Sequence, residues 1–331
     1  MKGHSKSLLI WLFVAGFLLS GCGQGNSQNE SLSTPLPEPS QIASNLTTTN
    51  PVSSGCKKIA FVMTSKSIPD IYTICPDGSK LTNLTNDSSS DSHPSWSPDG
   101  TKIAFASSRA GNSQIYIMDE NGNNPIKLTT DYENDFPIWL PDGKQIAFRT
   151  TDANGLWWWR IVNVESNGVL QFSEPSYDFF FQTPAWSPDG QSIAYMSLVE
   201  QQKRNDGSSQ IHIKNIDGSN DTALTNNVWA NINPIWSPDG IKIAFLSEQD
   251  GTYDMFALYV MDKNGTNIQK LTEPIYPENV NFAWSPDGQQ IAINNDVPAG
   301  NISIIDIKTG KSRELLHLSD GERASAPSWQ P

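Results

Sequence analysis

Side chains that commonly carry catalysis or bind metals are sparse in this sequence. The four histidines are His4, His93, His212 and His317, and no two of them have the i, i+4 spacing of a helical zinc motif. The sequence contains neither a Gly-x-Ser-x-Gly turn for a nucleophilic serine nor a glycine-rich phosphate loop. It therefore predicts no catalytic residues, no metal site and no cofactor.

One segment resembles the opening of a calcium-binding loop, because residues 119–123 read Asp-Glu-Asn-Gly-Asn. The twelfth residue of such a loop should be a glutamate, and Thr130 stands there instead. Asn-Gly is also a strong signal for a two-residue hairpin turn, since both central positions need a positive φ. We therefore interpret this segment as a hairpin turn.

The strands and turns that would position the polar side chains are specified by a sequence repeat. Tryptophan followed by a Pro-Asp-Gly turn occurs five times, and a further tryptophan, Trp329, lies near the C-terminus. The six tryptophans follow one another at intervals of 43 to 50 residues, at positions Trp96, Trp139, Trp186, Trp236, Trp284 and Trp329. A period of this size, built from short strands and turns, is typical of a β-propeller.

Residues 94–129 give the clearest copy. Strands are expected at residues 94–96, 103–106, 115–118 and 127–129, separated by turns rich in Pro, Asp, Asn and Gly. Four antiparallel strands without a helix make one propeller blade. The first copy begins near Cys56 and lacks a tryptophan strand, whereas Trp329 has no blade of its own. The sequence therefore predicts an all-β, six-bladed β-propeller of four-stranded antiparallel blades, closed by the C-terminal strand.

Polar residues precede each predicted inner strand. In a propeller these segments converge around the central channel on one face, where ligands commonly bind. They differ from blade to blade, unlike the tryptophans, so they form a candidate binding rim; the alternative is that they are merely solvated loop residues. The rim residues are His93, Asp135, Gln182, Asn233, Asn281 and Ser325.

The third copy is unusually aromatic. Its third strand contains three consecutive tryptophans followed by Arg160, at residues 157–160. We expect Trp157 and Trp159 to pack against neighbouring blades, because propeller sheets are buried on both faces. Phe179, Phe180 and Phe181 lie between strands and form a candidate exposed aromatic contact for a sugar or a protein.

The first 55 residues have a different composition. Lys2 and Lys6 precede an apolar run that ends in Ser-Gly-Cys, which is typical of a secretory signal. This ending resembles a bacterial lipobox, which implies a signal peptide at residues 1–21 and a lipid on Cys22; the alternative is an ordinary signal peptide followed by a chance cysteine. Residues 22–55 are rich in Ser, Thr, Asn and Pro and predict a disordered tether. The propeller is expected at residues 56–331.

The remaining cysteines and the charge limit the possible compartments and partners. Cys56 and Cys75 lie nearly opposite each other in the first hairpin, so a disulfide and two free thiols are both open. The net charge of −13 argues against nucleic acid as a partner. An acidic chain is not attracted to anionic lipid headgroups, so we expect a lipid, and not basic residues, to anchor it to a membrane.

The repeat resembles the WD40-like PD40 repeat of the TolB-like propeller family across residues 56–331. This resemblance implies an extracytoplasmic, non-catalytic binding platform in the bacterial cell envelope, tethered to a membrane through its lipid, with a protein, peptide or glycan as partner. The alternative is a lyase or hydrolase that acts on polysaccharides at the channel mouth. A purely structural envelope component is a third possibility.

Overall fold

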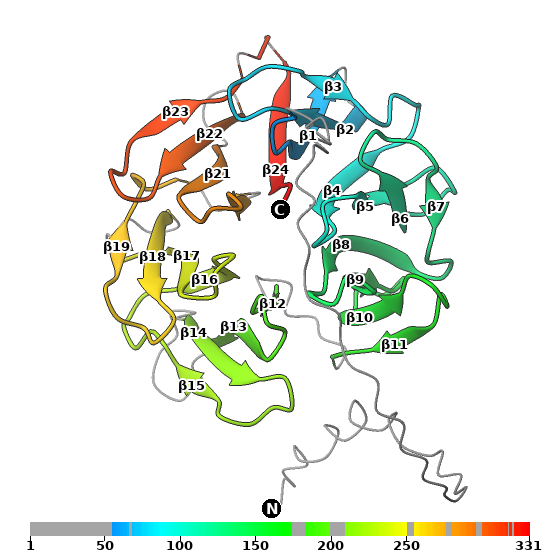
Figure 1. Cartoon of the computed structure of the whole chain (residues 1–331). Helices are drawn as coiled ribbons and strands as arrows, with labels where there is room; N and C mark the ends of the chain where they lie inside the picture. Colours follow the sequence, from blue (N-terminus) through cyan, green and yellow to red (C-terminus); the bar gives the residue numbers. More distant parts are fainter. Residues whose placement is uncertain are drawn as a thin grey trace, which may run out of the picture. The chain divides into compact units, whose positions relative to one another are not determined.

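The computed structural model describes residues 55–65, 68–173, 183–198, 209–249, 255–275, 280–295, 300–316, 318–319 and 321–331. Residues Cys56–Pro331 form one compact unit. Within the described residues of this unit, six four-stranded antiparallel sheets are arranged in a ring (Figure 1). The predicted six-bladed fold is therefore confirmed. Cys22, Gln182 and Phe179 to Phe181 lie outside the described residues.

Each sheet is one blade, and its strands follow one another from the inner to the outer edge of the ring. The first blade contains β24 (Arg323–Trp329), β1 (Ile59–Ser65), β2 (Ile68–Ile74) and β3 (Thr82–Asn83). The second contains β4 (Asp91–Trp96), β5 (Lys102–Ser107), β6 (Gln114–Asp119) and β7 (Ile126–Lys127). The third contains β8 (Glu133–Trp139), β9 (Gln145–Thr151), β10 (Trp157–Asn163) and β11 (Val169–Gln171).

The last three blades repeat this order. The fourth contains β12 (Ala185–Trp186), β13 (Ser192–Leu198), β14 (Ser209–Asn215) and β15 (Thr222–Ala223). The fifth contains β16 (Asn231–Trp236), β17 (Lys242–Ser247), β18 (Ala257–Asp262) and β19 (Gln269–Lys270). The sixth contains β20 (Phe282–Trp284), β21 (Gln290–Asn295), β22 (Asn301–Asp306) and β23 (Ser312–Glu314). The outermost strands are short, which limits pairing with other chains.

The Ser-Pro-Asp-Gly turn is stabilised by its own side chains. In the second blade, the Ser97 hydroxyl donates to Asp99 Oδ1 at 2.6 Å and accepts from the Lys102 amide at 2.9 Å. The hydrogen bond from Ser97 lowers the pKa of the Asp99 carboxyl. The same pair of bonds recurs around Ser187, Ser237 and Ser285. The repeated motif is therefore a structural turn in these blades.

The ring closes through its C-terminal strand. β24 pairs with β1, and Trp329 lies opposite Ile59. Gln330 then binds two other segments. Its side-chain amide nitrogen donates to Gly100 O at 2.9 Å, its side-chain oxygen accepts from Lys58 N at 3.0 Å, and its backbone nitrogen donates to Lys58 O at 2.8 Å. The predicted closure by the Trp329 strand is thus confirmed.

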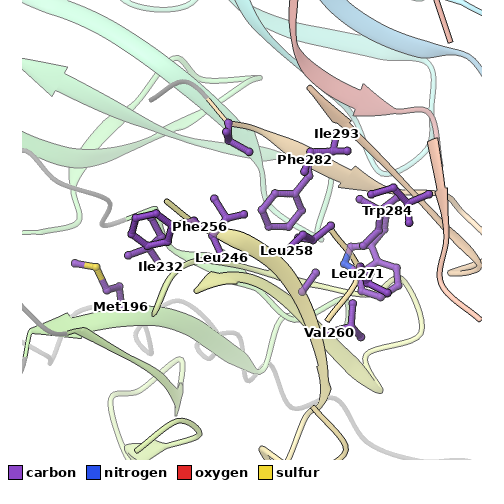
Figure 2. Packing of buried hydrophobic residues seen from close by; sticks show 14 residues of the cluster. Met196, Ile232, Leu246, Phe256, Leu258, Val260, Leu271, Phe282, Trp284 and Ile293 are labelled. Atoms are coloured by element: carbon purple, nitrogen blue, oxygen red, sulfur yellow. The ribbon is translucent and has the colours of Figure 1, made fainter. Parts of the chain in front are cut away.

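Apolar side chains fill the space between adjacent blades. In each such cluster the second strands contribute fully buried residues, such as Phe105 and Ile103 in β5. Figure 2 shows one cluster, in which Phe282 and Trp284 of the sixth blade pack beside Leu258 and Val260 of the fifth. Trp157 and Trp159 are only 3% and 4% exposed, as their predicted packing role requires.

A disulfide joins Cys56 to Cys75, whose Cα atoms are 5.7 Å apart. Cys56 lies just before β1 and Cys75 just after β2, so the bond connects the ends of the first hairpin. The structure thus forms the disulfide that the sequence left open. The part of the chain that the structure describes contains no helix that is long and apolar enough to cross a membrane.

Candidate binding face

Four inner strands contain the same irregularity three residues before their tryptophan. The pairing register shifts in β4, β8, β16 and β24. In each case the residue that precedes a proline has a φ near +50°: His93, Phe136, Asn233 and Ala326. Such values are uncommon for residues other than glycine, and a bulge of this kind re-aims the side chain. The bulges therefore set which side chains reach the channel rim.

Four of the predicted rim residues occupy two different positions of this bulge. His93 and Asn233 lie three residues before the tryptophan of their strand, whereas Asp135 and Ser325 lie four residues before it. Asn281 directly precedes β20, which pairs with β21 without a register shift. Phe136, which the sequence interpretation passed over, is the structural equivalent of His93. A bulge adds one residue to a strand and reverses the alternation of its side chains, so sequence spacing alone does not align these positions.

The structure brings two of the predicted rim residues together with two that were not predicted. The rings of His93 and Phe136, from neighbouring blades, have centres 3.7 Å apart. The guanidinium carbon of Arg149 in β9 lies 4.4 Å from the centre of the Phe136 ring. Arg149 also donates to both carboxylate oxygens of Asp135, at 2.9 and 2.6 Å. We call these four residues the rim cluster.

Burial controls the charges of the rim cluster. Burial and the nearby Arg149 guanidinium lower the pKa of His93 to about 4, so its imidazole is neutral at pH 7. Its Nδ1 atom lies 3.1 Å from Ser92 Oγ. Burial raises the pKa of Asp135, against the opposing effect of its hydrogen bonds from Arg149. The cluster thus offers a neutral aromatic surface beside a bidentate ion pair.

A second arginine, Arg109, lies on the second blade after β5. It donates to both oxygens of the buried Asp91 at 3.2 Å and forms an ion pair with Asp87 at 3.3 Å. Its guanidinium carbon is 5.2 and 5.1 Å from the ring centres of Phe105 and Tyr116. Burial raises the pKa of Asp91. The chain contains Ser-Arg at residues 108–109, but nothing in that pattern predicted this network.

The other histidine that the structure describes is not at the rim. His212 lies in β14, and its Nδ1 atom is 2.9 Å from Asp221 Oδ1. Tyr195 donates to the other oxygen of this carboxylate at 2.5 Å. Among the described residues, no group of three or more His, Cys, Asp or Glu side chains is placed to hold a metal ion.

Comparison with known proteins assigns the family. The model of the TolB beta propeller domain matches residues 42–197 and 180–331, which is most of the chain. The chain belongs to the TolB β-propeller family. The recognition of PD40-type repeats is thereby confirmed.

Individual relatives agree with this assignment. A TolB homologue from Chlorobium luteolum is 42% identical over 62 residues, a match that spans 19% of this chain and 14% of that protein. TolB from Acinetobacter baumannii superposes with a TM-score of 0.70 at 22% identity, covering 83% of this chain and 67% of the other. A TolB-like structure from Agrobacterium tumefaciens gives a TM-score of 0.55 at 20% identity, covering 84% and 100%. At these identities the two structures show a shared fold.

Proposed function

We propose that this protein is an extracytoplasmic, non-catalytic binding platform whose channel rim binds a protein, peptide or glycan of the cell envelope. The observation that carries the proposal is the rim cluster. It places an aromatic pair, contributed by two blades, beside an oriented arginine–carboxylate pair. Aromatic and arginine side chains of this kind dominate the energetics of protein interfaces.

The same geometry favours binding over catalysis. A general base near neutral pH needs a pKa close to 7 and a free lone pair aimed at its substrate. The pKa of His93 is far below that range, and its ring is packed on Phe136. Asp135 is engaged by Arg149 through both oxygens. These groups satisfy one another, so the rim is suited to recognition.

Three observations support a place outside the cytoplasm. A disulfide between Cys56 and Cys75 suits an oxidising compartment. Membership of the TolB β-propeller family agrees with the cell envelope. The lipobox-like sequence before Cys22 supports lipid attachment there, which would hold the protein at a membrane surface. Mass spectrometry of the mature N-terminus tests this attachment, and an unmodified Cys22 would remove the anchor from the proposal.

The decisive experiment is crosslinking in intact cells, followed by identification of the captured partner and a binding assay with it. His93→Asn and Phe136→Asn remove the two rings, while asparagine tolerates the left-handed backbone at both positions. We expect each variant to fold normally and to bind the partner about tenfold more weakly, as for an interface hot spot.

Lys80→Asn is the matched control. Lys80 is exposed and also has a positive φ of 58°, but it lies in the β2–β3 turn at the opposite ends of the strands. It should leave binding unchanged. If the rim variants bound the partner as well as the control does, the rim would be rejected as the binding site.

Elemental analysis of the purified protein tests the alternative function, a polysaccharide lyase or hydrolase. Stoichiometric manganese or zinc, together with cleavage of a polysaccharide, would show that the protein is an enzyme and not a binding platform.

A further inference from the structure

The loop before β8 presents an aromatic ring between two acids. Asp131, Tyr132 and Glu133 are consecutive and all exposed, and Tyr132 is 49% exposed. Tyr132 also has a φ of 55°, a left-handed conformation that is rare for a bulky residue. An exposed aromatic ring beside a carboxylate forms a surface that attracts cations.

Buried amide side chains hold this loop in place. Gln114 donates to the carbonyl of Tyr132 at 2.8 Å, and Asn134 donates to the carbonyl of Asp131 at 2.6 Å. Asn134 is completely buried and Gln114 is 4% exposed, and the two side chains hydrogen-bond to each other at 3.1 Å. The ring is thus preorganised, which lowers the entropic cost of binding.

Trp158 extends the aromatic surface. Side chains alternate along β10, so Trp157 and Trp159 are buried on one face while Trp158 points to the other and is partly exposed. Its ring meets the Tyr132 ring edge-on, with centres 5.2 Å apart and planes at 78°. The two rings come from different elements, the β8 loop and β10, and form one continuous surface.

The charge of this surface is negative. Arg160 donates to both oxygens of Asp131 at 2.9 and 3.0 Å and so compensates that carboxylate, and its guanidinium carbon lies 5.8 Å from the centre of the Tyr132 ring. Glu133 is exposed, and the structure gives it no ion pair or hydrogen bond to another side chain within the described residues. The whole chain carries a net charge of −13. The uncompensated charge at this surface is that of Glu133, so a positively charged partner complements it.

We propose that Tyr132, Glu133 and Trp158 form a docking site for a basic polypeptide segment. The charged end of a lysine or arginine side chain of that segment pairs with Glu133, while its aliphatic part contacts the Tyr132 and Trp158 rings. This site shares no residue with the rim cluster, and it extends the proposed function by assigning the chemistry of a partner.

The test uses the purified chain and a fluorescein-labelled peptide of repeating Lys-Ala-Arg-Ala, with a Glu-Ala-Asp-Ala peptide for comparison. Fluorescence anisotropy is measured at low and at physiological salt. Tyr132→Asn removes the ring at a position where asparagine suits the backbone, and it should weaken binding of the basic peptide about tenfold. Glu133→Gln should weaken it about threefold and reduce its salt dependence.

Two matched controls should bind within about twofold of the original protein, close to the effect of a neutral surface change. Leu170→Asn replaces another exposed apolar residue of the same blade, which is 67% exposed, and Glu314→Gln removes an exposed carboxylate of β23. The proposal fails if Tyr132→Asn and Glu133→Gln bind the basic peptide like these controls, or if the acidic peptide binds equally well.

If only His93→Asn lost binding of the basic peptide, the peptide would bind at the rim cluster and not at this site. Binding of cellotetraose, lost in Tyr132→Asn, without binding of the basic peptide would make the site a glycan site instead.

Discussion

The imidazole ring of His93 in the second blade packs on the phenyl ring of Phe136 in the third, with 3.7 Å between their centres. Both residues sit at the bulge of their inner strand and have φ values of 51°. The contact therefore depends on two backbone irregularities in separate sheets. It joins adjacent blades at the rim, above the apolar clusters that join them elsewhere.

Acid should weaken the fold through His93. Its pKa is about 4 in the folded protein against an ordinary value of 6.5, so the unfolded chain binds more protons between these two values. The stabilising effect is complete above pH 6.5 and is lost as the pH falls to 4, at a cost of about 2 kcal/mol for a partly solvated ring. Urea unfolding between pH 4 and 7 measures this loss.

The comparison variant for this measurement is His93→Asn, because Asp135 and Asp91 contribute in the opposite direction. Their carboxyl pKa values are raised by burial, so protonation of these groups favours the folded state. Both proteins retain the two carboxyls, and the difference between them isolates the imidazole. If the free energy of unfolding of the two proteins depended on pH in the same way, the lowered pKa of His93 would be contradicted.

Alanine at Gly122 should destabilise the protein more than alanine at Gly155. The two glycines have nearly the same φ, 85° and 82°. A Cβ at Gly122 would lie 2.6 Å from the Leu84 carbonyl oxygen, whereas a Cβ at Gly155 has nothing within 4 Å. The backbone penalty of about 1 kcal/mol is common to both, and the clash adds about 2 kcal/mol at Gly122. Chemical denaturation of both variants gives the difference in their free energies of unfolding. If both variants lost the same stability, the neighbouring blade would move to make room for the Cβ without cost.

Deletion of residues 324–331 should abolish the cooperative unfolding transition. It removes most of β24, the Trp329–Ile59 pair and all hydrogen bonds of Gln330. Apolar residues of β1 and β21 would then face solvent, because the cluster that holds Trp329 also contains Phe61 and Ala292. Calorimetry checks this, with Gln330→Ala as a milder companion that should lower the melting temperature without loss of cooperativity. An unchanged transition in the deletion would contradict the closure.

Loss of the disulfide should cost about 3 kcal/mol of stability, because the bond closes a loop between positions 19 residues apart. The double variant Cys56→Ala, Cys75→Ala and the chemically reduced protein should unfold at the same lower denaturant concentration. A reductant should then have no effect on the double variant. If reduction left the original protein unchanged, the bond would contribute nothing to the folded state.

The fold could be predicted from the sequence because each blade repeats local signals. The Trp-Ser-Pro-Asp-Gly turn encodes its own hydrogen bonds, and the apolar Ile-Ala-Phe strands are buried on both faces, as around Ile103. The unpartnered Trp329 also indicated how the ring closes. The exposed ends of the fourth strands were harder to place: β7 covers Ile126–Lys127 rather than residues 127–129.

The candidate site could be predicted only in part. The sequence singled out His93 and Asp135 as polar residues before an inner strand, and both belong to the rim cluster that we propose as the binding site. Phe136 and Arg149 were missed. In a linear sequence, an aromatic residue in a strand is expected in the core, and an arginine in a strand is expected on the surface. Their roles depend on a positive φ and on a neighbouring blade, and neither is a local property of the chain.

The order of synthesis gives the Gln330 contacts a further meaning. Gln330 is made after all the described strands, yet its side chain holds segments from the first and second blades together. The first blade is incomplete until β24 has emerged from the ribosome, so the ring closes only after the other described strands have been made. This order suits the extracytoplasmic location that we propose, because the ring cannot close until β24 has also been delivered.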